Sequence, residues 1–214
     1  MSLDTGSLDT GNTQIRVLAI SGSLRRASFN SGLLRAAQVL APAGMEVLIH
    51  DIRSIPFYDG DLEAGGDPEP VVALKSAIRD TDAVLLATPE YNWGTSGVLK
   101  NAIDWASRDR EEGSLMGKAA TIIGAGGRSG TARAQSQLQQ TLAETGNVVM
   151  VKPGVLVAAY SPLKFDSDGN LVDDDTKELL RKHLEEFAKW VIRVSTHREF
   201  IQYACEMDVQ LTHG

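Results

Sequence analysis

From residue 15 onward, hydrophobic positions fall into two kinds of segment that alternate along the chain. Short and nearly continuous apolar runs are typical of strands buried on both faces of a sheet. Such runs cover residues 15–20, 45–50, 82–88, 119–124 and 148–152. Longer segments place their apolar residues at helical spacing, which predicts amphipathic helices. These are expected over residues 28–41, 71–79, 97–107, 131–144 and 174–196.

The alternation of strands and helices predicts the fold class. Strands separated by helices form βαβ units, and these units build a parallel sheet with right-handed crossovers. We therefore predict an α/β fold, a doubly wound five-stranded parallel sheet of the flavodoxin-like order 2-1-3-4-5. Ligands bind such sheets beyond the carboxyl ends of the strands at the topological switch point. The loops after the first, third and fourth strands are therefore the candidate sites.

Both ends of the chain fall outside this pattern. Residues 1–14 carry the sequence SLDTG twice, which predicts a disordered tail or an added, non-native segment. A length of 214 residues favours one domain, which we place at residues 15–195. Residues 196–214 are then a C-terminal extension.

Composition narrows the class of protein. A formal net charge of −7 argues against nucleic acid and anionic membranes as partners, because both require basic surface. Nothing resembles a secretion signal or the roughly 18 apolar residues of a membrane span. The one cysteine, Cys205, suits a reducing compartment, so we expect a cytoplasmic protein.

The loop after the first expected strand collects groups that favour an anion. It reads Ser21-Gly-Ser-Leu-Arg-Arg-Ala-Ser-Phe-Asn30 and leads into an expected helix, whose N-terminus offers free N–H groups. The side chains suited to a phosphate are Ser23, Arg25, Ser28 and Asn30. The alternative is a plain turn in which Ser28 caps the helix. No GxGxxG or Walker A signature is present, which favours a mononucleotide.

The loop after the third expected strand is rich in aromatic and polar residues. It reads Pro89-Glu-Tyr-Asn-Trp-Gly-Thr-Ser-Gly97. Tyr91 and Trp93 can flank a flat heterocycle, while Glu90 and Asn92, or the backbone of this loop, can bind its polar edge. The alternative is that the two aromatic side chains only cover the edge of the sheet.

The remaining motifs carry less information. Gly124-Ala-Gly-Gly-Arg-Ser-Gly130 follows the fourth strand and either lets the backbone approach a ligand or forms a tight turn. Asp166-Ser-Asp-Gly predicts a turn, because its glycine comes too early for a calcium loop. Trp105 lies at helical spacing with apolar residues and is expected in the core.

The four histidines lack metal-ligand spacing, and no nucleophile–base pair is visible. We therefore expect no metal and no catalytic side chain, with a cofactor carrying the chemistry.

Two motifs in this order resemble the NADPH-dependent FMN reductase family, which includes flavodoxin-like quinone, chromate and azo-dye reductases. They are Gly22-Ser-Leu-Arg-x-x-Ser-x-Asn30 and Pro89-Glu-Tyr-Asn…Gly97-Val-Leu-Lys-Asn-Ala-Ile-Asp-Trp105. The resemblance implies non-covalent FMN with its phosphate on the first motif and its ring and ribityl chain on the second. The cofactor-binding residues are then Ser23, Arg25, Ser28, Phe29, Asn30, Pro89, Glu90, Tyr91, Asn92, Trp93, Gly126 and Gly127.

The resemblance also implies a function. It predicts an FMN-dependent NAD(P)H oxidoreductase that uses NADPH or NADH and reduces a quinone or similar small two-electron acceptor by ping-pong hydride transfer. Family members are typically dimers or tetramers, so a homo-oligomer is expected. The alternatives are an electron-carrier flavodoxin and a non-enzymatic flavin-binding or regulatory module. The family usually has x-Ser-x-Pro-Gly after the equivalent of Asn92, whereas this chain has Trp93-Gly-Thr-Ser-Gly97, so its acceptor pocket is expected to differ.

Overall fold

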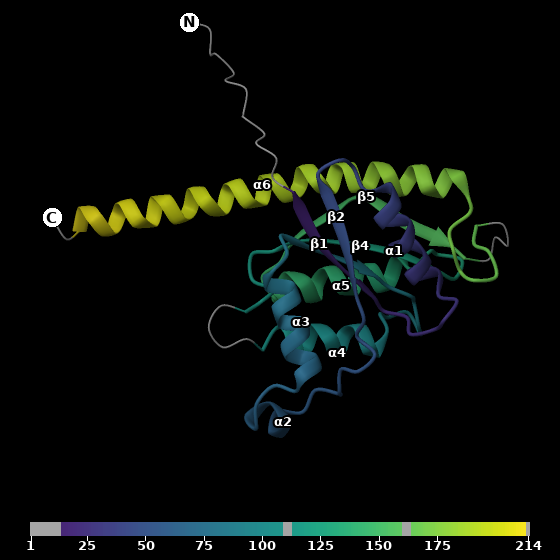
Figure 1. Ribbon diagram of the computed structural model, residues 1–214, viewed down its shortest axis with the longest axis horizontal. Helices are drawn as coiled ribbons and strands as arrows, with labels where there is room; N and C mark the ends of the chain where they lie inside the picture. Colours follow the sequence, from purple (N-terminus) through teal and green to yellow (C-terminus); the bar gives the residue numbers. More distant parts are fainter. Residues whose placement is uncertain (1–13, 109–112, 160–163, 213–214) are drawn as a thin grey trace, which may run out of the picture.

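The computed structural model describes residues 14–108, 113–159 and 164–212, with the backbone alone from residue 197 onward. Five strands form one parallel sheet of order β2-β1-β3-β4-β5, which confirms the predicted fold class (Figure 1). The strands are β1 (Ile15–Ser21), β2 (Met45–His50), β3 (Ala83–Ala87), β4 (Ala119–Gly126) and β5 (Val148–Ala158). The helices are α1 (Phe29–Leu40), α2 (Gly60–Ala64), α3 (Glu69–Arg79), α4 (Gly97–Ala106), α5 (Ala132–Glu144) and α6 (Asp174–Thr212).

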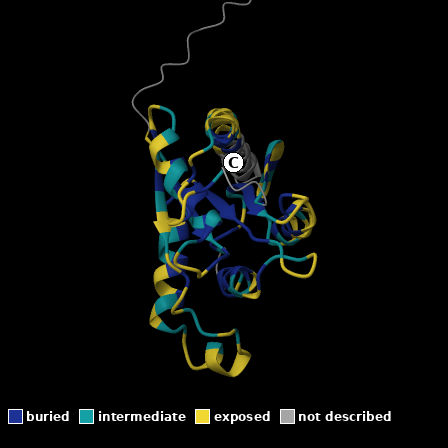
Figure 2. Cartoon of the chain, turned by 90° about the vertical axis from the view of Figure 1, so that its right-hand side faces the viewer, coloured by how far each residue is buried: buried dark blue, intermediate teal, exposed yellow. Residues whose placement is uncertain are grey.

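Two layers of helices enclose the sheet and create two apolar clusters. On one face, α1 and α6 pack Leu33, Leu184 and Phe187 against the strands. On the other face, α3, α4 and α5 contribute Leu74, Leu99, Leu138 and their neighbours. Figure 2 shows the buried residues concentrated at the sheet and the exposed ones on the outer helix faces. Burial on both faces explains why the strands read as continuous apolar runs.

Two elements differ from the sequence prediction near loops. The short helix α2 lies where a loop was expected, and none of its residues is buried, so it has no apolar periodicity to reveal it. Strand β5 extends to Ala158, well past the expected end at residue 152. The Lys152–Pro153 peptide bond is cis, and the pairing of β4 with β5 shifts register between Thr121 and Ile123. This irregularity accommodates the Pro-Gly pair within a longer strand.

Helix α6 also exceeds its expected end. It spans 39 residues and continues without a break past residue 196, so the proposed boundary at residue 195 falls inside one helix. Figure 1 shows its C-terminal part projecting beyond the sheet. The apolar stripe that revealed the helix belongs to the part packed on the sheet, which ends near Val194. Among the described residues, no helix combines the length and apolar character needed to cross a membrane. Residues 1–13, the bulk of the predicted tail, lie outside the described residues.

Candidate functional site

The loops after β1, β3 and β4 converge on one cavity at the carboxyl edge of the sheet. Its volume is about 480 Å³, within the range of small-molecule sites. It is lined by Ser23, Arg25, Ser28, Phe29, Asn30, Pro89, Glu90, Tyr91, Ala125, Gly126, Gly127 and Ala159. All the candidate site residues line it except Asn92 and Trp93, which lie in the adjoining turn. Ala125 and Ala159 were not anticipated, because an alanine carries no chemical signal in a sequence.

The loop from β1 to α1 has the donors that an anion needs. Within the described residues, the backbone N–H groups of residues 24–27 make no hydrogen bond. The Ser28 hydroxyl accepts from the Ser31 N–H at 3.2 Å, so Ser28 does cap the helix. The cap leaves the hydroxyl proton of Ser28 free to donate, and the Ser23 side chain is buried at the cavity wall. Capping and anion binding are therefore compatible in this loop.

Arg25 is the arginine of this loop that lines the cavity. Its guanidinium donates to the Ala27 carbonyl at 2.9 Å and lies 5.6 Å from the centre of the Phe29 ring. Phe29 in turn stacks on Phe165 with ring centres 4.5 Å apart. This stack holds an exposed arginine at the rim of the cavity, where its remaining N–H groups can face a phosphate.

A turn packed beneath the first loop fixes its backbone. Asp166 accepts hydrogen bonds from the N–H groups of Asp168 and Asn170 at 3.0 and 2.8 Å, which confirms the predicted turn. These bonds, above all that from Asn170, lower the pKa of Asp166. A side chain at Gly32 would lie 1.8 Å from the Gly169 carbonyl oxygen, so the turn and α1 require this glycine. No group of possible metal ligands occurs in residues 14–108, 113–159 and 164–196.

Asn30 ties the first loop to β4. Its carboxamide donates to the Ala125 carbonyl and accepts from the Ala125 N–H, both at 2.9 Å, and the side chain is buried. The expected contact of Asn30 with a phosphate stays a prediction, since the side chain also lines the cavity. Asn30 holds the carboxyl end of β4 beside the anion-binding loop.

Glu90 binds the start of α5 with its carboxylate. The helix has Thr131 in a left-handed conformation and no side-chain cap of its own. Glu90 supplies the cap by accepting from the N–H groups of Arg133 and Ala134 at 2.9 and 3.2 Å, and its carboxylate pairs with the Arg133 guanidinium at 3.0 Å. Burial opposes ionisation, but the hydrogen bonds from Ala134, Arg133 and Ser129 outweigh it and lower the pKa of Glu90. This carboxylate thus binds the start of α5, and the expected contact of Glu90 with the edge of a heterocycle stays a prediction.

Asn92 and Trp93 form the tip of a tight turn. Both have positive φ, at 50° and 70°, and Tyr91 and Gly94 exchange two backbone hydrogen bonds, as in a type I′ turn. The Trp93 side chain is 72% exposed, which excludes a place in the core. Its ring lies 4.5 Å from the Arg133 guanidinium carbon. Trp105, in contrast, is fully buried as predicted.

A second cavity of about 390 Å³ adjoins the first. It is lined by Gly22, Leu24, Arg25, Phe57, Tyr91, Ser96, Gly97 and Val98. Arg25 and Tyr91 line both cavities. The sequence did not lead us to place Leu24 and Phe57 at the site, although an aromatic residue such as Phe57 in a Pro- and Gly-rich loop can indicate a binding residue.

A parallel sheet of this order with an anion-binding loop at its switch point is the architecture of mononucleotide-binding proteins. Residues 15–161 match the family model described as NADPH-dependent FMN reductase. The chain is 47% identical over 181 residues to an NAD(P)H-dependent FMN reductase of Pseudomonas aeruginosa, covering 84% of this chain and 97% of that protein. It is 42% identical over 185 residues to an NADPH:quinone oxidoreductase of Arabidopsis thaliana, covering 84% and 93%.

A solved structure agrees with these sequence relatives. The NAD(P)H:acceptor oxidoreductase FerB of Paracoccus denitrificans superimposes with a TM-score of 0.76 at 37% identity, covering 84% of this chain and 98% of that one. The chain therefore belongs to the NADPH-dependent FMN reductase family. It is an oxidoreductase whose cofactor is FMN and whose co-substrate is NAD(P)H.

Proposed function

We propose that this protein oxidises NAD(P)H with FMN and passes the electrons to quinones or similar two-electron acceptors by ping-pong hydride transfer. The observation that carries the proposal is the cavity in which one anion-binding loop faces the loops after β3 and β4. Several relatives of this chain are named as quinone oxidoreductases or quinone reductases.

The residues present fit FMN. The free amides of residues 24–27, the hydroxyls of Ser23 and Ser28 and the Arg25 guanidinium form one donor set for a phosphate. Pro89, Tyr91 and the glycines at the end of β4 leave a cavity for the ribityl chain and the ring. When bound, FMN supplies the hydride chemistry. The chain orients both substrates. Glu90 and Asn30 hold the three loops in fixed positions relative to one another.

The need of both substrates to reach one flavin ring favours a mechanism with two successive half-reactions. Because NAD(P)H and the acceptor must each reach the same ring, one has to leave before the other binds. Initial rates at varied NADH and quinone concentrations are expected to give parallel double-reciprocal lines. Under nitrogen, NADH should bleach the flavin, and a quinone added afterwards should restore its colour. Intersecting lines would contradict ping-pong order.

A stable semiquinone without NAD(P)H oxidation would indicate an electron carrier instead. A protein that takes up no flavin would indicate a regulatory module.

A homo-oligomer completes the proposal. Tyr91 and Trp93 are exposed beside the FMN cavity, so this face has apolar area that a second copy can shield. Light scattering is expected to show a mass of at least twice the 23.0 kDa of one chain. A single species of 23.0 kDa at all working concentrations would contradict this expectation. The single cysteine fits the cytoplasm as the place of action.

A further inference from the structure

We propose that the second cavity binds the apolar substituents of the electron acceptor, and that Phe57 is the residue that recognises them. The inference rests on the proposed quinone reductase function and specifies which acceptors it favours. The two cavities meet at Arg25 and Tyr91, so a molecule whose carbonyl ring lies in the FMN cavity can extend directly into the second one.

The lining of the second cavity is suited to an apolar group. Leu24, Phe57 and Val98 present apolar side chains, and the glycines at 22 and 97 present none. Two lining residues carry a hydroxyl. That of Ser96 is buried and accepts from the Leu99 N–H at 3.4 Å as the cap of α4, and that of Tyr91 belongs to a residue that also lines the FMN cavity. The only charged group, Arg25, stands on the side of the FMN cavity. An electron acceptor with its polar ring toward FMN and its apolar substituents in the second cavity matches this distribution.

Helix α4 holds the backbone on both sides of Phe57. The Pro56 carbonyl accepts from the Asn101 amide at 2.8 Å and from the Trp105 indole N–H at 2.9 Å. The Tyr58 N–H donates to the Asn101 side-chain oxygen at 2.8 Å. These three bonds fix the chain direction at Phe57, and they come from one helix that also begins at the cavity wall.

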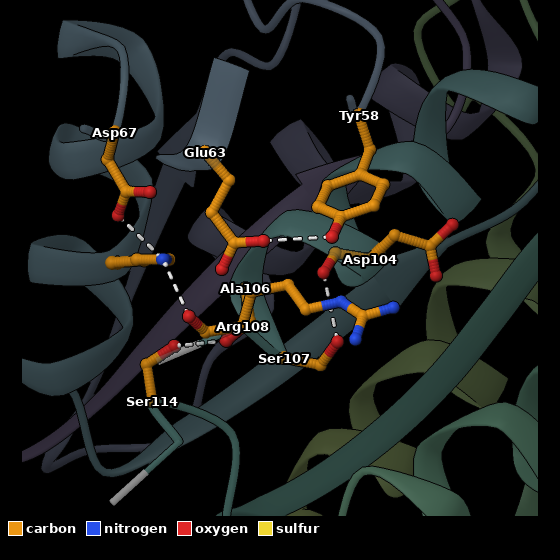
Figure 3. Close-up of polar contacts among 9 residues, drawn as sticks. Tyr58, Glu63, Asp67, Asp104, Ala106, Ser107, Arg108 and Ser114 are labelled. Carbon is orange, nitrogen blue, oxygen red and sulfur yellow. Dashed lines mark hydrogen bonds and ion pairs between the residues drawn. The ribbon is translucent and has the colours of Figure 1, made fainter. Parts of the chain in front are cut away.

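The Tyr58 side chain adds a second attachment, shown in Figure 3. Its hydroxyl donates to Glu63 at 2.8 Å, and its ring lies edge-on to Trp105 with centres 5.1 Å apart. The Arg108 guanidinium lies 5.0 Å from the centre of the Tyr58 ring. The segment is thus rigidly placed, yet the Phe57 side chain is 80% exposed. Because the backbone on both sides of Phe57 is already fixed, a ligand that contacts this side chain costs little backbone conformational freedom.

A small ligand explains this arrangement better than a macromolecule. The cavity shares Arg25 and Tyr91 with the FMN cavity and has the size of a small-molecule site. The alternative is that a second copy of this chain covers Phe57. Measuring the oligomeric state of a Phe57 variant distinguishes this alternative from ligand binding.

The experiment compares FMN-loaded, full-length protein with its Phe57→Ser variant. The acceptors are 1,4-benzoquinones carrying linear alkyl chains from methyl to decyl, and kcat/KM is measured at saturating NADH. For the unaltered protein, kcat/KM should rise roughly two- to fourfold per methylene over the first few methylenes, as expected for burial of apolar groups. In the variant this rise should flatten, so that the decyl quinone loses about fivefold or more while the methyl quinone changes by less than about twofold.

Two further measurements complete the design. Val39→Ser is the matched control, because Val39 is 83% exposed on α1 and lines neither cavity. It should keep the dependence on chain length. Calorimetric dissociation constants for the matching alkyl hydroquinones, which the enzyme cannot reduce further, should follow the same trend as kcat/KM.

Equal chain-length profiles for Phe57→Ser and the unaltered protein would overturn the inference. Dissociation of the oligomer by Phe57→Ser, with no such change for Val39→Ser, would assign the patch to a contact between copies and also overturn it. Failure of the unaltered protein to reduce any quinone would instead refute the proposed function, and the inference with it.

Discussion

Replacing Arg25 with alanine is expected to weaken FMN binding about ten- to a hundredfold. A hydrogen bond between charged groups contributes roughly 1.5–3 kcal/mol, and Arg25 is the guanidinium at the anion-binding end of the cavity. The fold should survive, because Arg25 is exposed and its one hydrogen bond within the chain goes to the nearby Ala27 carbonyl. Titration of the apoprotein with FMN, followed by flavin fluorescence, measures the dissociation constant directly.

The neighbouring arginine provides the control for this prediction. Arg26 is also exposed but does not line the cavity, so Arg26→Ala removes the same charge from the same loop. It should change the FMN dissociation constant much less than Arg25→Ala. An unchanged dissociation constant in Arg25→Ala would place the phosphate elsewhere.

Replacing Trp93 with alanine is expected to alter the ranking of acceptors and to leave thermal stability nearly intact. Trp93 lies two residues after Tyr91, which lines the FMN cavity, and its exposed ring can stack on a planar acceptor or restrict its entry. What the fold loses is the contact with Arg133, worth about 0.5–1 kcal/mol at an exposed site. The relative kcat/KM for one-ring and two-ring quinones should therefore shift severalfold, while the melting temperature moves little.

Trp93→Phe is the matched variant, since it keeps a flat ring at the same backbone position. It should fall between the alanine variant and the unaltered protein in acceptor preference. A loss of roughly 3–5 kcal/mol of unfolding free energy with an unaltered acceptor ranking would show that Trp93 is a packing residue.

The fold could be predicted from the chain because each strand carries a local signal. Burial between two helix layers forces continuous apolar runs in β1, β3 and β4, and this pattern needs no knowledge of distant residues. The ends of strands and helices are harder to predict where contacts with distant residues determine them. Strand β5 continues through Pro153 because β4 shifts register beside it, and no local pattern encodes that shift.

The location of the site was also predictable, but the roles of individual side chains were not. The motifs after β1 and β3 identify the two loops, and the topology brings them together. Asn30 and Glu90, however, are engaged by partners 95 and 43 residues away in the chain, Ala125 and Arg133. From the sequence alone, a polar residue in a loop is expected to be available for a ligand. Only the folded chain shows the distant groups to which it is already hydrogen-bonded. The sequence shows Phe57 as an aromatic residue in a loop, but its place beside the site depends on hydrogen bonds from Asn101 and Trp105 in another element.

The most direct test of the account is the identity and behaviour of the flavin that the purified or reconstituted protein holds. The anion-binding loop and the absence of a dinucleotide signature predict one FMN per chain, released on denaturation and bleached by NADH or NADPH under nitrogen. Absorption spectra with mass spectrometry of the released cofactor decide the matter. Release of FMN would support the cavity assigned here, whereas release of FAD, or no binding of FMN added at micromolar concentration, would contradict it.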